Sequence, residues 1–172
     1  MMRIKLIAIM AAMMLSSMNI CAQTKKVVTK QTERFCIAKD GKAATIVVDE
    51  NDWKGVVRAA NDLSDDIRKV TGVSGSVRLI DNGQWSMDNG QYPIIVGTIG
   101  KSKLIDKLIK QKKLNVKPIK GHWEGYCIDV VDGNLVIAGN DKRGTIYGIY
   151  EISKRIGVSP WYWMADASGC TD

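Results

Sequence analysis

The sequence is poor in the residues that most often carry catalysis and metal binding. It has one histidine, His122, and four cysteines in 172 residues, and no two cysteines have CxxC spacing. A structural zinc site takes closely paired Cys and His ligands, so the sequence predicts no metal site and no cofactor. A Ser-His-Asp triad would have to use His122, and the GxSxG motif that would present its serine is absent.

The sequence also lacks an apolar run long enough to span a bilayer comfortably. The run at residues 6–17 has about 12 residues, whereas a membrane helix needs about 20. Basic residues precede this run and a small residue, Ala22, follows it, which predicts a cleaved signal peptide over residues 1–22. The mature protein is therefore expected to be exported, to the periplasm or beyond, without a membrane attachment. Lipidation at Cys21 is the alternative.

Cysteine is scarce enough to limit disulfide bonding. Three cysteines remain after residue 22, namely Cys36, Cys127 and Cys170, and an odd number in an exported chain leaves at least one thiol free. Cys36 and Cys127 lie in apolar, strand-like runs, so both are predicted to be small core residues. A disulfide between these two remains an open alternative.

Aromatic residues are missing from the most basic part of the chain. The formal net charge is +7, and loss of Arg3 and Lys5 with the signal peptide would lower it by two. The remaining surplus is concentrated in the lysines of residues 101–120, which we interpret as a solvated helix face and its following loop. Attraction to an acidic glycan is the alternative. Nucleic acid is not an expected partner, because no aromatic side chains are interleaved with these lysines.

What the sequence does contain is an ordinary globular domain. Hydrophobic residues make up 45% and charged residues 25% of the chain, and its length suits one domain. Residues 23–32 are predicted to be a flexible leader and residues 33–166 an α/β domain. Residues 167–172 are predicted to be a divergent tail.

Strands and helices alternate along the domain. Strands are expected at residues 34–38, 45–48, 76–80, 92–96, 124–131 and 135–138. Helices are expected over residues 53–70, after the N-cap Ser102, and over residues 142–155, with Gly72 ending the first and Gly157 the last. In the first helix, Trp53 and Val70 belong to the expected inward stripe, and acids at residues 49–52 are expected to cap it. In the last helix, Ile146, Ile149 and Tyr150 are expected to face the core.

The fold class that follows is α/β, or α+β-like, with about three helices and a mixed β-sheet. Two hairpins interrupt the alternation, at residues 39–42 and 131–134, so the sheet is not expected to be purely parallel. The second hairpin carries Asp132-Gly133, a strong turn signal.

Two glycine-containing turns resemble phosphate-binding motifs without matching them. Residues 97–102 end like a Walker A loop, but Gly97 and Gly100 have only two residues between them, where the pattern needs four. We interpret this segment as a plain turn, with nucleotide binding as the alternative that depends on it alone. Residues 139–144 lack GxGxxG spacing. There, Asp141 is predicted to be an N-cap, Gly144 to allow a close approach of helix and sheet, and Arg143 to be free to leave the domain.

No pair of carboxylates has the arrangement that hydrolysis of a glycosidic bond requires. Such chemistry needs two acids placed across the bond, and the acids of this chain are scattered over caps and polar helix faces. The sequence therefore predicts no catalytic residue.

Two segments near the end of the chain carry a family resemblance. Residues 138–150, AGNDKRGTIYGIY, and residues 156–163, IGVSPWYW, resemble the N-terminal domain of family 115 glycoside hydrolases, the xylan α-1,2-glucuronidases. The resemblance covers roughly residues 46–166. A shorter RG…YG pattern also occurs in the accessory domains of hexosaminidases and other α-glucuronidases.

This resemblance implies a secreted accessory domain that precedes a catalytic barrel and is inactive by itself. The family pattern continues into the barrel where this chain ends, so a truncation before the barrel is expected. The implied partners are the missing barrel and an acidic saccharide derived from xylan. Asp141, Arg143, Trp161 and Trp163 are predicted to form an interdomain interface or the edge of a substrate site. A stand-alone exported carbohydrate-binding or interaction module is the alternative.

Overall fold

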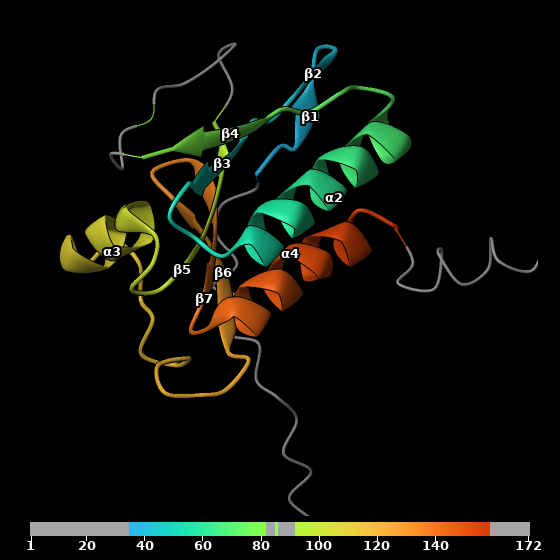
Figure 1. The fold of residues 1–172 in the computed structure, drawn as a ribbon. Coiled ribbons are helices and arrows are strands. Elements are labelled where there is room, and N and C mark those ends of the chain that lie inside the picture. Colours follow the sequence, from blue (N-terminus) through green and yellow to red (C-terminus); the bar gives the residue numbers. More distant parts are fainter. Residues whose placement is uncertain (1–34, 82–84, 86–91, 159–172) are drawn as a thin grey trace, which may run out of the picture.

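The computed structural model describes residues 35–81, 85 and 92–158, and a five-stranded sheet lies at its centre (Figure 1). The strands lie in the order β4-β3-β5-β7-β6. Their bounds are Ile46–Asp49 for β3, Val77–Ile80 for β4, Ile94–Thr98 for β5, Tyr126–Val131 for β6 and Asn134–Gly139 for β7. A separate pair, β1 (Ala38–Lys39) and β2 (Lys42–Ala43), forms a small antiparallel hairpin.

The sheet is mixed, as the sequence predicts. Four strands, β4, β3, β5 and β7, run parallel to one another. The fifth strand, β6, lies at one edge and runs antiparallel to β7. The three inner strands β3, β5 and β7 are buried along their whole length, which explains their continuous apolar sequences. The hairpin between β6 and β7 turns at Asp132 and Gly133, both with positive φ, as the Asp-Gly pair predicts.

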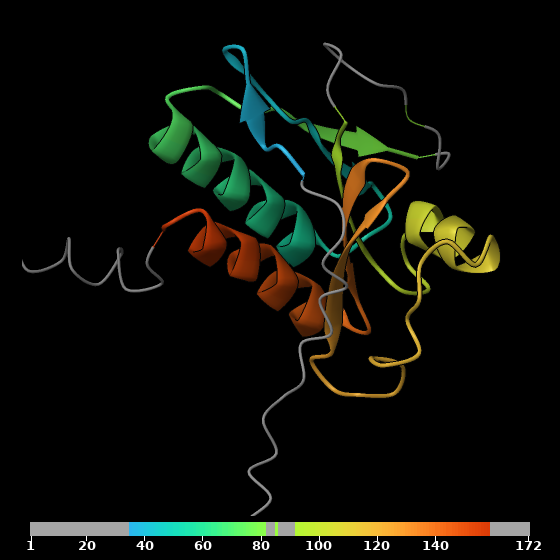
Figure 2. The ribbon, with the colours of Figure 1, turned by 180° about the vertical axis from the view of Figure 1, so that it is seen from behind.

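Helices cover both faces of the sheet. Figures 1 and 2 show α2 (Lys54–Thr71) and α4 (Lys142–Arg155) side by side on one face, with α3 (Lys103–Lys110) on the other. One apolar cluster fills the space beneath α2 and α4, and a second lies between the sheet and α3. No helix in the described part of the chain is long and apolar enough to cross a membrane.

Most of the predicted helix ends are confirmed. Gly72 ends α2 in the left-handed conformation with φ of 72°, which glycine adopts without strain. The hydroxyl of Ser102 accepts a hydrogen bond from the amide of Ile105 and caps α3. Helix α4 begins after the N-cap Asp141, whose side chain accepts from the amide of Gly144.

Several predicted orientations are wrong. Trp53 and Val70, at the two ends of the expected inward stripe of α2, are 44% and 49% exposed, because only the middle of this helix faces the sheet. Tyr150 is 45% exposed and donates its hydroxyl to Asp62 on α2. The segment predicted to form two strands, at residues 34–38 and 45–48, forms three in the structure. Strands β1 and β2 pair around Asp40-Gly41, and β3 follows as a separate strand.

The two described cysteines are free thiols in different surroundings. Cys36 is exposed, so its predicted place in the core is wrong, and it lies just before the small hairpin instead of in the sheet. Cys127 is half-buried on β6, where burial raises the pKa of its thiol to about 11. Cys170 lies outside the described residues.

Two glycines let α4 lie directly on its neighbours. A Cβ on Gly148 would come 2.7 Å from Cγ2 of Ile137 on β7. A Cβ on Gly144 would overlap the backbone carbonyl of Gly125, in the connector before β6. The close approach of helix and sheet predicted for Gly144 is therefore made by Gly148, whereas Gly144 accommodates the connector.

We expect Gly144→Ala to destabilise the fold by about 1–3 kcal/mol, because the new methyl group would push against backbone that cannot rotate away. In a helix interior without this contact, the same change would stabilise by up to about 1 kcal/mol. The midpoint of urea denaturation measures the difference.

Gly55→Ala in α2 is the matched control. Its added Cβ would lie 3.5 Å from Ile146 and 3.9 Å from Lys142, which is ordinary contact, so stability should be unchanged or slightly higher. Equal midpoints for the two variants would contradict the close packing of α4.

Candidate functional site

The carboxyl edge of the sheet is the place where an α/β fold most often holds a site. Strands β3, β5 and β7 end there at Asp49, Thr98 and Gly139, and α2, α3 and α4 begin from it. Strand β6 starts at the same edge, since Tyr126 pairs with Gly139. Figure 1 shows these ends together with the connector at residues 111–125.

Asp49 joins two elements at this edge. It is fully buried, and its Oδ2 accepts a hydrogen bond of 2.8 Å from the amide of Lys103, the first residue of α3. Its Oδ1 accepts from the backbone and side-chain nitrogens of Asn51. The acid predicted to cap α2 therefore stabilises the start of α3 instead.

Asp52 is the second buried carboxylate, with 6% exposure. Its Oδ2 accepts from the amide of Thr98 at 2.6 Å, and its Oδ1 accepts from the hydroxyl of Thr98 at 2.8 Å and the amide of Trp53 at 2.7 Å. The N-cap of α2 is Trp53, without a side-chain cap. The predicted capping of α2 by the acids of residues 49–52 is thus wrong, because Asp49 accepts from α3 and Asp52 from β5.

The network continues from β5 to α4. The hydroxyls of Thr98 and Thr145 lie 2.8 Å apart, and both residues are buried. The hydroxyl of Thr145 also lies 3.0 Å from the carbonyl oxygen of Asp141. The start of α2, the end of β5 and the first turn of α4 are thereby held at one point of the edge.

Asp141, one of the predicted site residues, uses both carboxylate oxygens within the fold. Oδ1 accepts from the amide of Gly144 and Oδ2 from the amide of Glu124, each at 2.8 Å. Glu124 has φ of 56°, a strained conformation for a residue other than glycine. Burial tends to raise the pKa of Asp141, but the backbone hydrogen bonds and the nearby Arg143 outweigh it and hold this pKa below its ordinary value.

Arg143, the second predicted site residue, is not free to leave the domain. It forms an ion pair of 3.1 Å with Glu124 and donates a hydrogen bond of 2.8 Å to the hydroxyl of Tyr147. Its side chain is nevertheless 55% exposed. Arg143 is therefore presented on the surface in a fixed orientation, beside the ring of Tyr147.

Three aromatic side chains lie exposed in the segments that meet at this edge. Trp53 is 44%, Trp123 77% and Tyr147 39% exposed. The ammonium of Lys101 lies 4.7 Å from the centre of the Trp53 ring, within the range of a cation–π contact. We call Trp53, Trp123, Arg143 and Tyr147 the edge patch.

Sequence reasoning missed most of the edge patch. Trp53 had the spacing of a core residue, and Trp123 stands next to His122 without a motif of its own. The signal that could have found them is their position next to the expected strand and helix ends. Trp161 and Trp163 lie outside the described residues, so their predicted role stays a prediction.

The buried acids of the carboxyl edge are not free to act as an acid–base pair. Asp49, Asp52 and Asp141 accept hydrogen bonds from the protein itself, as given above. His122 is exposed, and its carbonyl group accepts from Gly125 and Asn140. No group of three or more Asp, Glu, His or Cys residues in the described part could hold a metal ion.

The turn at residues 97–102 is structural. A Cβ on Gly97 would overlap the side chain of Ser102, and Gly100 has φ of 77°, so each glycine serves the packing or the backbone of the turn. The edge can therefore recognise another surface through aromatic and cationic groups, whereas Asp49, Asp52 and Asp141 are committed to the fold.

Comparison with known proteins gives a family and a set of structural relatives. The family model described as "Glycosyl hydrolase family 67 N-terminus" matches residues 26–152. Among solved structures, the chain resembles a family GH115 4-O-methyl-alpha-glucuronidase with specificity for decorated arabinogalactans, at 36% identity and a TM-score of 0.57. This match covers 74% of the present chain and 15% of that protein.

More distant similarities were found to CpGH84D and to a GH138 enzyme targeting pectin rhamnogalacturonan II. The first has 10% identity and a TM-score of 0.47, and covers 67% of this chain and 18% of that one. The second has 17% identity and a TM-score of 0.39, and covers 67% and 14%. No curated protein matches the chain.

We expect Asp52→Asn to destabilise the chain by about 1–3 kcal/mol, because an amide NH₂ would face the buried amide or hydroxyl of Thr98 and leave a donor unsatisfied. Chemical denaturation measures the change. Asp65→Asn is the control, since Asp65 is 62% exposed and pairs only with Arg68 on the surface, and should cost less than about 1 kcal/mol. Similar losses in both variants would show that the network at the edge is not stabilising.

Asp141 should make stability depend on acid pH. Because its pKa is lower in the folded state, its carboxylate stabilises the fold above its unfolded pKa of about 3.9, and this contribution is lost as pH falls through the folded value. An asparagine at this position would still cap α4 through its carbonyl oxygen. We therefore expect Asp141→Asn to be less stable at pH 7 and the gap from the wild-type protein to shrink between pH 4 and pH 2. A gap that stays constant over that range would contradict the prediction.

Proposed function

The chain belongs to the glycosyl hydrolase family 67 N-terminal family, and on that premise we propose that it is the accessory domain of an exported α-glucuronidase of the family 115 type. Its carboxyl edge would dock against the catalytic domain of that enzyme. The catalytic domain would release glucuronic acid side chains from a polysaccharide such as xylan. By itself, the present chain would not hydrolyse glycosides.

Two observations support the enzyme class. A relative with 36% identity is a 4-O-methyl-alpha-glucuronidase, and the present chain corresponds to 15% of its length. The DKRGTIYG segment quoted above lies in this chain at the start of α4, where it builds the first turn and places Arg143 in the edge patch. The basic, apolar and small segments of residues 1–22 support export.

The single observation that carries docking is the composition of the carboxyl edge. Asp49, Asp52 and Asp141 are satisfied within the fold, whereas three aromatic rings and one guanidinium are exposed. Trp, Tyr and Arg are the residues that contribute most to protein interfaces. Exposing rings such as Trp123 to water is unfavourable unless another surface covers them.

Arg143 suits such an interface because its planar guanidinium is already oriented. The hydrogen bond from Arg143 to Tyr147 and the ion pair with Glu124 limit the rotamers of its long side chain. A carboxylate on the catalytic domain, or on an acidic saccharide held at the boundary, could then bind with less loss of side-chain entropy. Asp141 would act indirectly, by holding Glu124 and the first turn of α4 in place.

A chimera tests this proposal. Residues 35–158 would replace the matching segment of the 4-O-methyl-alpha-glucuronidase, and Trp123→Ala would be introduced into the chimera and into the isolated chain. In the isolated chain, we expect a change in stability within about 0.5 kcal/mol, since the ring is at the surface. In the chimera, we expect a loss of about 2 kcal/mol or more, because an interface contact is removed.

Val70→Ala is the matched control, because Val70 is 49% exposed in the last turn of α2, at the end of the helix away from the carboxyl edge. It should behave alike in both proteins. An equal effect of Trp123→Ala in the chimera and the isolated chain would exclude docking through this edge. Release of glucuronic acid by the isolated chain alone would contradict its accessory role.

A further inference from the structure

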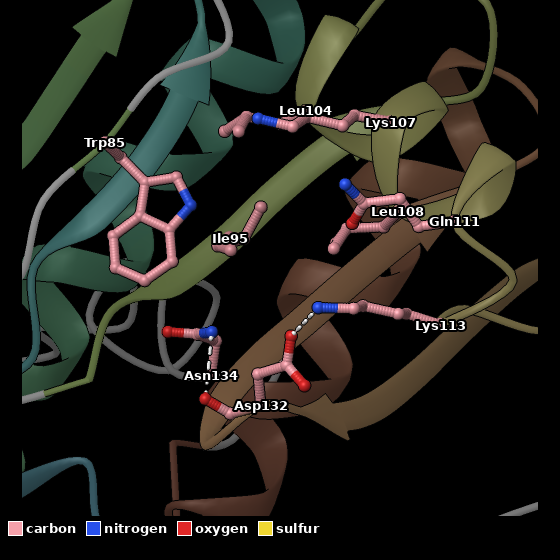
Figure 3. A pocket seen from close by; sticks show the side chains of 9 residues that line it. All are labelled: Trp85, Ile95, Leu104, Lys107, Leu108, Gln111, Lys113, Asp132 and Asn134. Atoms are coloured by element: carbon pink, nitrogen blue, oxygen red, sulfur yellow. Dashed lines mark hydrogen bonds and ion pairs between the residues drawn. The ribbon is translucent and has the colours of Figure 1, made fainter.

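A pocket lies at the other end of the sheet, between α3, Trp85 and the start of β7 (Figure 3). Its volume is about 440 Å³, which is within the usual range for small-molecule sites. Its floor is apolar, built from β5 and α3, and its walls are polar. Asn134 at the beginning of β7 marks the amino end of that strand, and the pocket extends from there along α3 to Leu104, without including any residue of the edge patch.

The most unusual group in the pocket is the amide of Asn134. Asn134 is only 5% exposed, and its nitrogen donates to the carbonyl groups of Val131 and Asp132. Its Oδ1 is buried without a hydrogen-bond partner. Such an acceptor is costly when it is left unpaired, but less than 1 Å² of this atom is accessible from the pocket, so Asn134 shapes the wall and is not itself open to a ligand.

Charge is distributed unevenly around the pocket. Lys113 forms an ion pair of 2.6 Å with Asp132, so these two charges offset each other. The side chain of Lys107 lines the pocket and, in Figure 3, extends toward the side where Trp85 lies. Its ammonium has no carboxylate or hydrogen-bond partner among the described residues. One net positive charge therefore faces the pocket and favours a ligand with a single negative charge.

Trp85 and Gln111 complete the set of groups. The Trp85 ring is partly buried against the apolar cluster beneath α3 and forms one wall of the pocket. An indole ring can stack on the apolar face of a sugar ring. The side chain of Gln111 offers both a donor and an acceptor at the opposite wall.

We propose that this pocket binds a uronic acid residue of a saccharide. The carboxylate would pair with Lys107, a ring hydroxyl would form a hydrogen bond with the side-chain amide of Gln111, and the face of the sugar ring would lie on Trp85. A uronic acid has all three features, namely one carboxylate, several hydroxyl donors and an apolar ring face. The choice of a sugar rests on the proposed function, whereas the three contacts rest on the pocket itself.

This site would differ from the proposed docking surface in its position and its role. Because it contains none of the edge-patch residues, docking through the edge patch would not occupy it. The domain could then hold a uronic acid of the polysaccharide while the catalytic domain acts on another side chain of the same polymer.

Calorimetric titration of the purified chain with glucuronic acid tests the proposal. We expect saturable 1:1 binding with a Kd on the order of 1 mM, as suits so small a ligand. Lys107→Gln should weaken it about tenfold, and Trp85→Ala should abolish it. Lys110→Gln, which removes an exposed lysine of the same helix outside the pocket, should leave binding unchanged.

Two further measurements test which ligand groups are recognised and where on the protein the ligand binds. Glucose, which lacks the carboxylate, and benzoate, which lacks the hydroxyls, should each bind at least tenfold more weakly. Amide chemical shifts should change at α3 and the β6–β7 turn.

No saturable binding, equal effects of Lys107→Gln and Lys110→Gln, or shifts confined to the carboxyl edge would overturn the proposal. None of these outcomes would affect docking, which the chimera measures independently at Trp123.

Discussion

The arrangement of this domain depends on the buried carboxylate of Asp52 and its two hydrogen bonds to Thr98. Parallel strands leave their carboxyl ends without the tight hairpin turns that hold antiparallel strands together. Here, Asp52 joins the residue before α2 to the last residue of β5, and the contact of Thr98 with Thr145 extends the connection to α4. Two helices and a central strand are therefore fixed relative to one another at a single buried point.

This constraint also decides what the carboxyl edge can do. Acids that bind the protein's own amides are not available to a substrate, and the structure uses Asp49, Asp52 and Asp141 in this way. What remains at the surface is a rigid frame that carries aromatic rings and Arg143. Such an edge suits recognition of another surface, which agrees with membership in a family of N-terminal domains and with the small fraction of the glucuronidase that the chain covers.

Much of the fold follows from local sequence patterns. The bounds of α4, residues 142–155, and the turn at Asp132-Gly133 were predictable, because caps, glycines and periodic apolar residues act over a few positions. The buried strands β5 and β7 were predictable from continuous apolar runs. The edge strand β6 was placed by its hairpin with β7.

The parts that escaped prediction depend on contacts between distant segments. Nothing near Asp49 or Asp52 in the sequence indicates that their partners are Lys103 and Thr98, because strand order decides it. Trp53 has helical spacing, yet it lies at the start of α2, beyond the region that the sheet covers. The pocket beside α3 combines residues from four separated segments, and the unpaired Oδ1 of Asn134 becomes visible only after folding.

Docking through the carboxyl edge, whose buried acids serve the fold, can be tested by hydroxyl-radical footprinting. The experiment compares the oxidation of Trp53 and Trp123 in the isolated chain and in the chimera with the glucuronidase. We expect strong oxidation of both rings in the isolated chain and clear protection in the chimera, while exposed Tyr150 on the other part of α4 reacts alike in both. Equal oxidation of Trp53 and Trp123 in the two proteins would contradict it.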